Sequence, residues 1–328
     1  MDAKKTVLVT GATGFIGAHV CRLLLSSGYR VRALLRDRNK PLSGIAVNSD
    51  LEQCLGDLLD SDSLGRACKD VDVVVHLAGV AHANNIKRDD LFEVNAHGTE
   101  LLLAAAVKQS VRKFILLSSS LASPDVNNIT SYGESKRAAE NLVLASHNLG
   151  RLDAVVLRPV NVYGKGMTGN IASLISLIAQ RRIPPLPLVG TKISLIGVCD
   201  LAVAIRLAIE LDQARGNTYL VTDGQQYHIS DIEKAIYLAV GRKMSRWKPP
   251  RLLLYIAVVF VALVTKTLTI FRINRPPLFR GVSKRTYQNL VNDNLFDNFE
   301  IVNELGFEPK SSFYDALPDI VGAVNHRS

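Results

Sequence analysis

The chain has 328 residues, 48% hydrophobic and 21% charged, so it is long enough to bury a large core and to form two domains. Its four cysteines are scattered without a CxxC pair, which argues against a disulfide framework or a zinc site and predicts no bound metal. The formal net charge of +9 suits an anionic substrate or an anionic membrane surface. Nucleic acid is not expected as a partner, because the basic residues do not alternate with aromatic ones.

The first half of the chain alternates apolar strand patterns with helical patterns. Strands are predicted at residues 5–10, 29–36, 71–79, 112–120 and 152–159, with another just ahead of "CLGDLLD". Helices are predicted at residues 18–28 and 95–110. This alternation predicts an α/β fold, a Rossmann-type doubly wound parallel sheet with helices on both faces.

Beyond about residue 165 the strict alternation ends. We therefore expect a dinucleotide-binding domain over residues 1–165 and a smaller C-terminal α/β substrate domain over 166–328, with 196–225 returning to the sheet. Within the second half, Ser230 followed three residues later by Glu233 predicts a capping box. The substrate is expected in the cleft between the two domains.

A glycine-rich turn follows the first predicted strand. In "TGATGFIG", Gly11, Gly14 and Gly17 are spaced by three residues and enclose Phe15 and Ile16 at the start of a helix. The first glycine permits a tight turn, the second lets the backbone approach a pyrophosphate, and the third lets helix and strand pack closely. The turn therefore predicts a dinucleotide cofactor at the positive end of the helix.

The end of the second predicted strand bears on which dinucleotide binds. An acidic residue there would hold the ribose 2′-hydroxyl of NAD, but the sequence "ALLRDR" has Leu35 at this place and Arg36 after it. Arg36 suits a 2′-phosphate and favours NADP over NAD, the alternative being a solvated loop charge. After the third strand, Asp57, with its neighbour Leu58, is expected at the adenine edge.

A tyrosine and a lysine four residues apart lie on one face of a predicted helix. Tyr132 and Lys136 occur in "SYGESK", and the strand upstream ends in Ser118, Ser119 and Ser120. A tyrosine with a pKa of about 10 is a poor base at neutral pH, but a nearby ammonium group favours its phenolate form. Tyr132 could then take a proton from a sugar hydroxyl while a hydride leaves the same carbon.

These motifs together resemble those of the extended short-chain dehydrogenases/reductases, within the nucleotide-sugar epimerase/dehydratase family. The resemblance runs nearly end to end, through "TGATGFIG", "VVHLAG", "FEVNAHGT", "LLSSS", "YGESK", "LRPVNVYGKG" and "NELGFEPKSSFYDAL". It implies that Tyr132 is the general base, that Lys136 is its partner and a ribose ligand, and that Ser120 binds the reacting oxygen.

The same resemblance implies the remaining site residues. The implied cofactor contacts are His76, Leu77, Ala78, Gly79, Asn95, Ser118 and Pro159. The implied substrate contacts, besides Ser120, are His82, Asn161, Gly169 and Asn170, with Arg158 and Tyr163 at the edge of the sugar pocket. For His82 the alternative interpretation is an ordinary loop histidine. Ile193 departs from the family, which usually has an arginine there, and the adjacent Lys192 is a potential replacement.

The most apolar stretch of the chain is "RLLLYIAVVFVALVTKTLTIFR", residues 251–272. Its unbroken apolar part, residues 252–264, is shorter than the ~20 residues that a membrane span needs, and basic residues flank it on both sides. Three alternatives remain open: a core or lid helix, a peripheral membrane contact through residues 252–271, and a span, which is least favoured.

The resemblance leaves several functions open. We expect oxidoreduction at C4 of a nucleotide-linked hexose or N-acetylhexosamine, with UDP-sugar 4-epimerase first. The alternatives are an NADPH-dependent 4-ketoreductase that makes a UDP-deoxyhexosamine and a 4-epimerase for a polyprenyl-diphosphate-linked sugar. A non-catalytic dinucleotide-binding scaffold is disfavoured, because Ser120, Tyr132 and Lys136 are all present. The N-terminus lacks signal-peptide architecture, so a cytoplasmic protein is expected, with contact to the inner membrane face and a homodimer as open alternatives.

Overall fold

The computed structural model describes residues 4–37, 39, 42, 44–45, 49–80, 86–126, 129–270 and 284–325. The chain divides into two compact units. The first comprises residues 1–162, 196–223 and 297–311, and the second comprises residues 163–195, 224–296 and 312–328.

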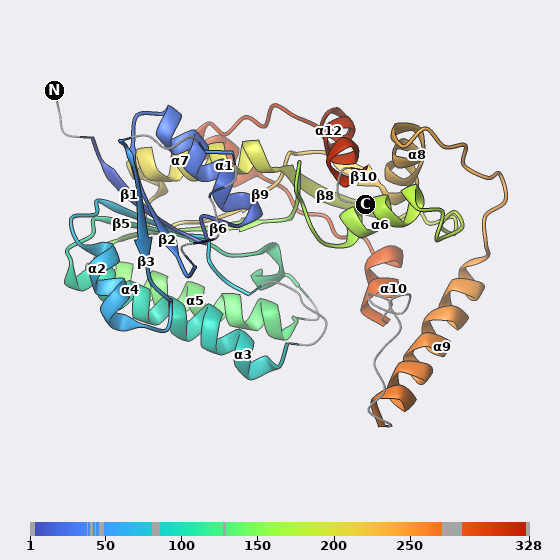
Figure 1. Ribbon diagram of the computed structural model, residues 1–328, viewed down its shortest axis with the longest axis horizontal. Helices are drawn as coiled ribbons and strands as arrows, with labels where there is room; N and C mark the ends of the chain where they lie inside the picture. Colours follow the sequence, from blue (N-terminus) through green and yellow to red (C-terminus); the bar gives the residue numbers. More distant parts are fainter. Residues whose placement is uncertain are drawn as a thin grey trace. The chain divides into compact units, whose positions relative to one another are not determined.

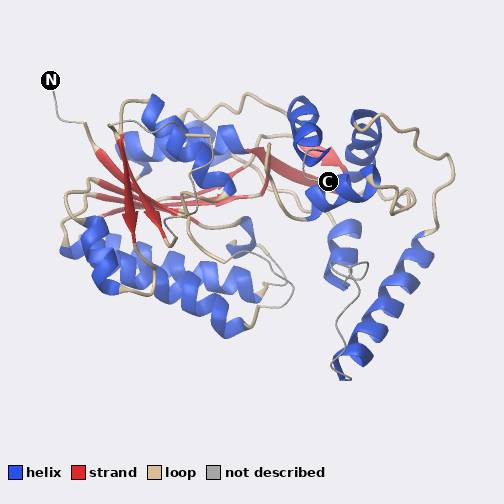
Figure 2. Cartoon of the chain, in the orientation of Figure 1, coloured by secondary structure: helices blue, strands red, loops and turns tan. Residues whose placement is uncertain are grey.

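The first unit is built on a parallel sheet, whose strands are red in Figure 2. The sheet has seven strands in the order β3-β2-β1-β4-β5-β6-β9. Every neighbouring pair in it is parallel, so the predicted doubly wound parallel sheet is confirmed. The strands are β1 (Thr6–Thr10), β2 (Arg30–Leu35), β3 (Leu51–Leu55), β4 (Val73–His76), β5 (Lys113–Leu117), β6 (Asp153–Pro159) and β9 (Thr218–Val221).

Helices cover both faces of this sheet (Figure 1). Helices α1 (Phe15–Ser26) and α7 (Val198–Glu210) pack together on one face. Helices α2 (Ser61–Cys68), α4 (Gly98–Lys108) and α5 (Ser131–Asn148) cover the other. The two central strands β1 and β4 are apolar and buried along almost their whole length, because a sheet covered on both faces has no solvated side.

The strand order reverses between β1 and β4, since β2 and β3 lie on one side of β1 and β5, β6 and β9 lie beyond β4. Open α/β sheets bind their ligands at the carboxyl ends of the strands at such a reversal. The short helix α3 (Arg88–Phe92) and a π-helical turn at Glu93–His97 connect β4 to α4 near this point. Helix α11 (Phe299–Leu305) completes the unit and packs against β9.

The second unit has a small aromatic core. The ring of Phe313 makes edge-to-face contacts with Tyr163 and Tyr227, at centroid distances of 5.6 and 6.1 Å. A three-stranded sheet has the order β10-β8-β7, with β7 at Asn161–Tyr163, β8 at Lys192–Gly197 and β10 at Gln226–His228. Its helices are α6 (Asn170–Ala179), α8 (Ile229–Ala239), α9 (Arg251–Ile270), α10 (Lys284–Val291) and α12 (Phe313–Asn325).

The predicted capping box at the start of α8 is wrong. The helix begins after His228, which makes no side-chain cap, and Ser230 lies within it. Glu233 instead turns inward and is buried, where it accepts hydrogen bonds from the Leu186 N–H (2.5 Å) and from Lys248 Nζ (3.1 Å). A buried carboxylate needs such partners, and this requirement outweighs the gain from an N-terminal cap.

The apolar stretch near residue 260 forms α9, which packs beside α10 through the rings of Tyr255 and Tyr287, 5.4 Å apart. Within the described residues, no helix combines the length and the hydropathy that crossing a membrane requires.

Candidate active site at the carboxyl ends of the parallel strands

The turn after β1 brings its backbone close to the end of β4. Gly11 has a φ of +69°, and a Cβ built on it would lie only 2.8 Å from the backbone nitrogen of Ala78. A Cβ on Gly17 would overlap the carbonyl oxygen of Gly11, so α1 packs directly onto the turn. The residue before α1 is Gly14, which has no side chain to cap the first N–H groups of the helix. The start of α1 is therefore suited to a phosphate group.

The backbone after β4 lies so close to Asn95 that Gly79 has no room for a side chain. A Cβ built on Gly79 would lie 2.9 Å from Asn95 Oδ1 and 3.8 Å from Lys136 Nζ. The Asn95 side chain accepts from the Val80 N–H (2.8 Å), and its amide donates to Val80 O (3.1 Å) and to Ser135 Oγ (3.0 Å). These bonds fix the backbone after β4 beside Lys136, and together with the glycine turn this stretch fits a dinucleotide such as NAD.

A buried chain of hydrogen bonds supports this edge of the sheet. Thr99 Oγ1 donates its proton to the Asn95 carbonyl (2.6 Å), so it must accept from His76 Nε2 (3.0 Å). His76 Nδ1 is then an acceptor and receives the proton of Thr10 Oγ1 (2.7 Å), which itself accepts from the Ala78 N–H (3.1 Å). These hydrogen bonds therefore place a proton on His76 Nε2 and none on Nδ1, so His76 is neutral.

Tyr132 and Lys136 lie one turn apart on α5, whose start is capped by Thr130 Oγ1 accepting from the Gly133 N–H (3.1 Å). Burial raises the pKa of Tyr132 to about 12, although a hydrogen bond with the Ser119 side chain acts to lower it. Burial also lowers the pKa of Lys136 to about 8, while the nearby Glu140 carboxylate acts to raise it. The lysine is thus still charged at neutral pH.

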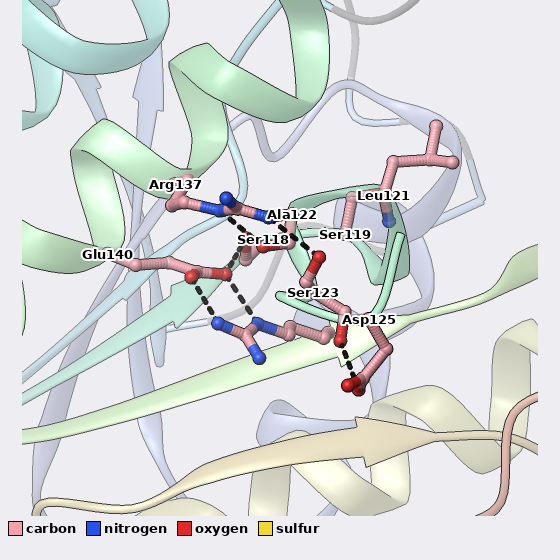
Figure 3. Close-up of polar contacts among 9 residues, drawn as sticks. Ser118, Ser119, Leu121, Ala122, Ser123, Asp125, Arg137 and Glu140 are labelled. Atoms are coloured by element: carbon pink, nitrogen blue, oxygen red, sulfur yellow. Dashed lines mark hydrogen bonds and ion pairs between the residues drawn. The ribbon is translucent and has the colours of Figure 1, made fainter. Parts of the chain in front are cut away.

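Glu140, two turns beyond Tyr132 on α5, is the centre of a buried polar cluster (Figure 3). Its oxygens accept from Arg158 Nε (2.9 Å) and Nη2 (2.7 Å), and the Ser118 hydroxyl donates to it as well. Only 1% of Glu140 is exposed, and 16% of the Arg158 side chain, so the pair is largely shielded from solvent. The cluster joins α5 to the ends of β5 and β6.

The loop that carries Ser119 and Ser120 is fixed from the same helix. Arg137 donates from Nε to Ala122 O (2.9 Å) and from Nη2 to Ser123 O (2.7 Å), as Figure 3 shows. Gly133, four residues before Arg137 on the same helix, also packs directly on the loop, because a Cβ there would overlap the carbonyl oxygen of Leu121. This close packing explains why glycine follows Tyr132.

Comparison with known proteins identifies the family. Residues 7–222 match the model of the NAD dependent epimerase/dehydratase family, which is more than half of the chain. The chain belongs to this family. The match covers the glycine turn, the Tyr132–Lys136 pair and all seven strands of the large sheet. The predicted family is therefore confirmed, and with it an NAD-dependent enzyme of the epimerase/dehydratase type.

Relatives of similar sequence carry names that refer to different substrates. The chain is 30% identical to a UDP-glucose 4-epimerase of Vibrio cholerae over 269 residues, which is 75% of this chain and 78% of that protein. It is 26% identical to a 3 beta-hydroxysteroid dehydrogenase/Delta 5→4-isomerase of Mycobacterium tuberculosis over 341 aligned positions, 95% of this chain and 88% of that one.

Solved structures share the fold. The structure of a UDP-glucuronic acid 4-epimerase from Bacillus cereus in complex with NAD superposes with a TM-score of 0.76. The comparison covers 98% of this chain and 99% of that one at 20% identity.

The other residues predicted at the cofactor surround the ends of the first strands. Phe15 and Ile16 form the first turn of α1, and Arg36 is exposed directly after β2. Asp57 Oδ1 accepts a hydrogen bond from the Leu59 N–H (2.9 Å), so one oxygen of this carboxylate already has a partner within its own turn. Leu58 is buried close to Gly98, and Leu77 directly follows β4.

Three residues predicted near the cofactor or substrate have structural partners. Ser118 and Arg158 both bind Glu140, so their side chains are engaged in the cluster. Tyr163 is buried against Phe313 in the core of the second unit. Pro159 is the last residue of β6, and Asn161 is exposed at the start of β7.

In the second unit, Gly169 has a φ of +98° and precedes α6, which starts at Asn170. Ile193 is buried, and Lys192 Nζ lies 3.5 Å from Gln226 Oε1. His82 lies outside the described residues.

Sequence reasoning did not single out two residues near the site. It assigned the reacting oxygen to Ser120, which stays a prediction, and gave no role to Ser119, whose side chain is hydrogen-bonded with Tyr132 in the structure. It also passed over Glu140, although its position four residues after Lys136 placed it on the same helix face.

The buried His76 network predicts a specific dependence of stability on pH. Burial, together with the Lys136 charge, lowers the pKa of His76 to about 3, against about 6.5 in an unfolded chain. The unfolded chain therefore binds one more proton between these values, and the free energy of unfolding should fall by about 1.4 kcal/mol per unit as pH drops from 6 to 4. His76→Asn should remove this one-proton share of the slope in urea unfolding.

Thr99→Val is the matched control for this measurement. It breaks the same network but keeps the buried imidazole, so it should lower stability at every pH by about 1–3 kcal/mol and retain the wild-type slope. Equal slopes for wild type and His76→Asn would contradict a buried neutral His76.

Proposed function

We propose that the chain transfers a hydride between NAD(P) and C4 of a nucleotide-linked hexose or N-acetylhexosamine, as a UDP-sugar 4-epimerase. The observation that carries this proposal is the Tyr132 hydroxyl, hydrogen-bonded to Ser119 one helical turn from Lys136. The similarity to a relative named UDP-glucose 4-epimerase supports the same choice.

Tyr132, Ser119 and Lys136 would each have a separate role in removing the proton of the C4 hydroxyl. Bound NAD(P) supplies the hydride acceptor. Tyr132 takes the proton from the C4 hydroxyl, and Ser119 binds the same oxygen. Because burial raises the pKa of Tyr132 to about 12, its phenolate needs a positive charge nearby, and we assign this role to Lys136, one turn away on α5. Reversal of these transfers on the opposite face of the 4-keto sugar gives the 4-epimer.

The cofactor and the nucleotide would use residues already described. Gly11, Gly14 and Gly17 would hold the pyrophosphate, and Asn95 and Lys136 would lie along the nicotinamide half. The contacts of Asn161, Gly169, Asn170 and His82 with the sugar nucleotide stay predictions.

A second candidate is an NADPH-dependent 4-ketoreductase that makes a UDP-deoxyhexosamine. The observation in its favour is the exposed Arg36 after β2, where Leu35 replaces the acidic residue that would hold the 2′-hydroxyl of NAD. A reductase consumes its cofactor in every turnover, so NADPH specificity suits it better than it suits an epimerase.

The two functions separate in one assay. The purified chain is given UDP-N-acetylglucosamine without added cofactor, and the products are resolved by anion-exchange chromatography and NMR. We expect conversion to the 4-epimer, and Tyr132→Phe should lower the rate by at least about 10³-fold because the proton acceptor is lost. Oxidation of NADPH by a UDP-4-keto-6-deoxy sugar, with no epimerisation, would favour the reductase. Full activity of Tyr132→Phe would contradict both.

The serine that binds the reacting oxygen can be identified by substitution. Ser119→Ala should lower kcat by about 10²-fold with little change in KM, because it removes a hydrogen bond to the reacting centre. Ser120→Ala, at the adjacent buried position, is the matched control and should lower kcat less than about ten-fold. Ser119→Thr keeps the hydroxyl and should recover part of the loss. The reverse ranking would return the role to Ser120.

Cofactor preference should depend on Arg36. Arg36→Ala should weaken binding of NADP at least about ten-fold in calorimetry, because a charged hydrogen bond to the 2′-phosphate is lost, and should leave NAD binding within about two-fold. Arg30→Ala, at the opposite end of β2, is the matched control and should change neither. Tighter binding of NAD than NADP by the wild-type chain would overturn the preference.

A further inference from the structure

The basic charge of this chain is concentrated in one segment. Residues 234–292 contain 12 of its 39 lysines and arginines and none of its 30 acidic residues. The other 27 basic residues are slightly outnumbered by those 30 acidic ones, so this segment accounts for the entire positive balance of +9. A segment of this kind attracts anionic surfaces.

The same segment contains α9, whose two sides have opposite surroundings. Val258 and Val261 are buried, and Tyr255 stacks edge-on against Tyr287 of α10. Away from this buried side lie five exposed apolar residues, which we call the α9 face. They are Leu252 (66% exposed), Leu253 (51%), Ile256 (52%), Val259 (39%) and Phe260 (60%). Soluble proteins rarely leave such a continuous apolar face in water.

Further exposed apolar and basic side chains occur in the same unit, most of them at the start of α9 or in the residues just before it. Trp247 and Leu188 are both largely exposed, and Arg251 at the start of α9 donates from Nε to Leu188 O (2.8 Å). Lys243 and Arg246 are exposed shortly before α9. Tryptophan beside cations and an apolar helix face is the composition typical of helices that lie in a membrane interface.

We propose that the second unit docks on the surface of an anionic phospholipid bilayer, with the α9 face lying in the interface. The apolar residues would enter the acyl boundary, while the cations of residues 234–292 would bind lipid phosphates. A second copy of this chain fits the face less well, because pairing would bring two such cationic segments together without an acidic partner. The proposal does not depend on the substrate of the enzyme.

Vesicle flotation with the purified full-length chain tests the proposal. We expect binding to vesicles of phosphatidylcholine with about 30% phosphatidylglycerol at 0.1 M NaCl to exceed binding to pure phosphatidylcholine by at least about ten-fold. Ile256→Asp/Phe260→Asp should weaken that binding at least about ten-fold, because each exposed side chain contributes apolar area. Lys243→Glu/Arg246→Glu should weaken it similarly, since it reverses two charges.

Leu149→Asp is the matched control, because Leu149 is an equally exposed leucine of the first unit. It should bind vesicles like the wild type, and all variants should keep wild-type circular dichroism and NAD binding. The proposal is overturned by equal binding to both kinds of vesicle, by no binding to either, or by an equal loss in Leu149→Asp. A dimer in analytical ultracentrifugation that Ile256→Asp/Phe260→Asp dissociates, without vesicle binding, would assign the face to a second copy.

Discussion

The position of α5 depends on the buried ion pair between Glu140 and Arg158. The pair joins the helix to β6, and the Ser118 hydroxyl extends the same contact to the end of β5. Removing one partner of such a pair typically costs 3–5 kcal/mol, because the other charge stays buried without a partner. Since Tyr132, Lys136 and Glu140 follow each other at intervals of four residues, fixing Glu140 also fixes the height and rotation of the other two.

Burial disfavours the charged form of both His76 and Lys136, but their partners make the outcome differ. For His76 it favours the neutral form, and the ordered hydrogen bonds from Thr10 to Asn95 then need no counter-charge. For Lys136 it also disfavours the charge, but the Glu140 carboxylate offsets part of this effect and keeps its pKa at about 8. One carboxylate therefore both positions the lysine and keeps it charged, while the histidine supports the backbone without adding charge to the site.

Much of the fold and part of the site follow from sequence. The alternation of buried strands and helices predicts the parallel sheet, because only such a sheet buries both faces of each strand. The glycine spacing predicts the turn at Gly11, where a positive φ excludes most other residues. The hydrogen bond between Ser119 and Tyr132 does not follow from sequence, because it depends on how the strand end continues into the next turn. The partners of Glu233 likewise come from tertiary packing, which overrode a local capping pattern.

The α9 face differs from these features because the folding of its unit does not require it. The core of that unit is formed by Tyr163, Tyr227 and Phe313, and α9 contributes to packing through its opposite side. Exposed leucine, isoleucine and phenylalanine side chains gain no burial energy on folding and increase the risk of aggregation. Repulsion among the cations of residues 234–292 adds a further cost in water. Both costs disappear at an anionic surface that covers the apolar side chains and neutralises the charge. The exposed apolar face and the concentrated positive charge thus have a single explanation.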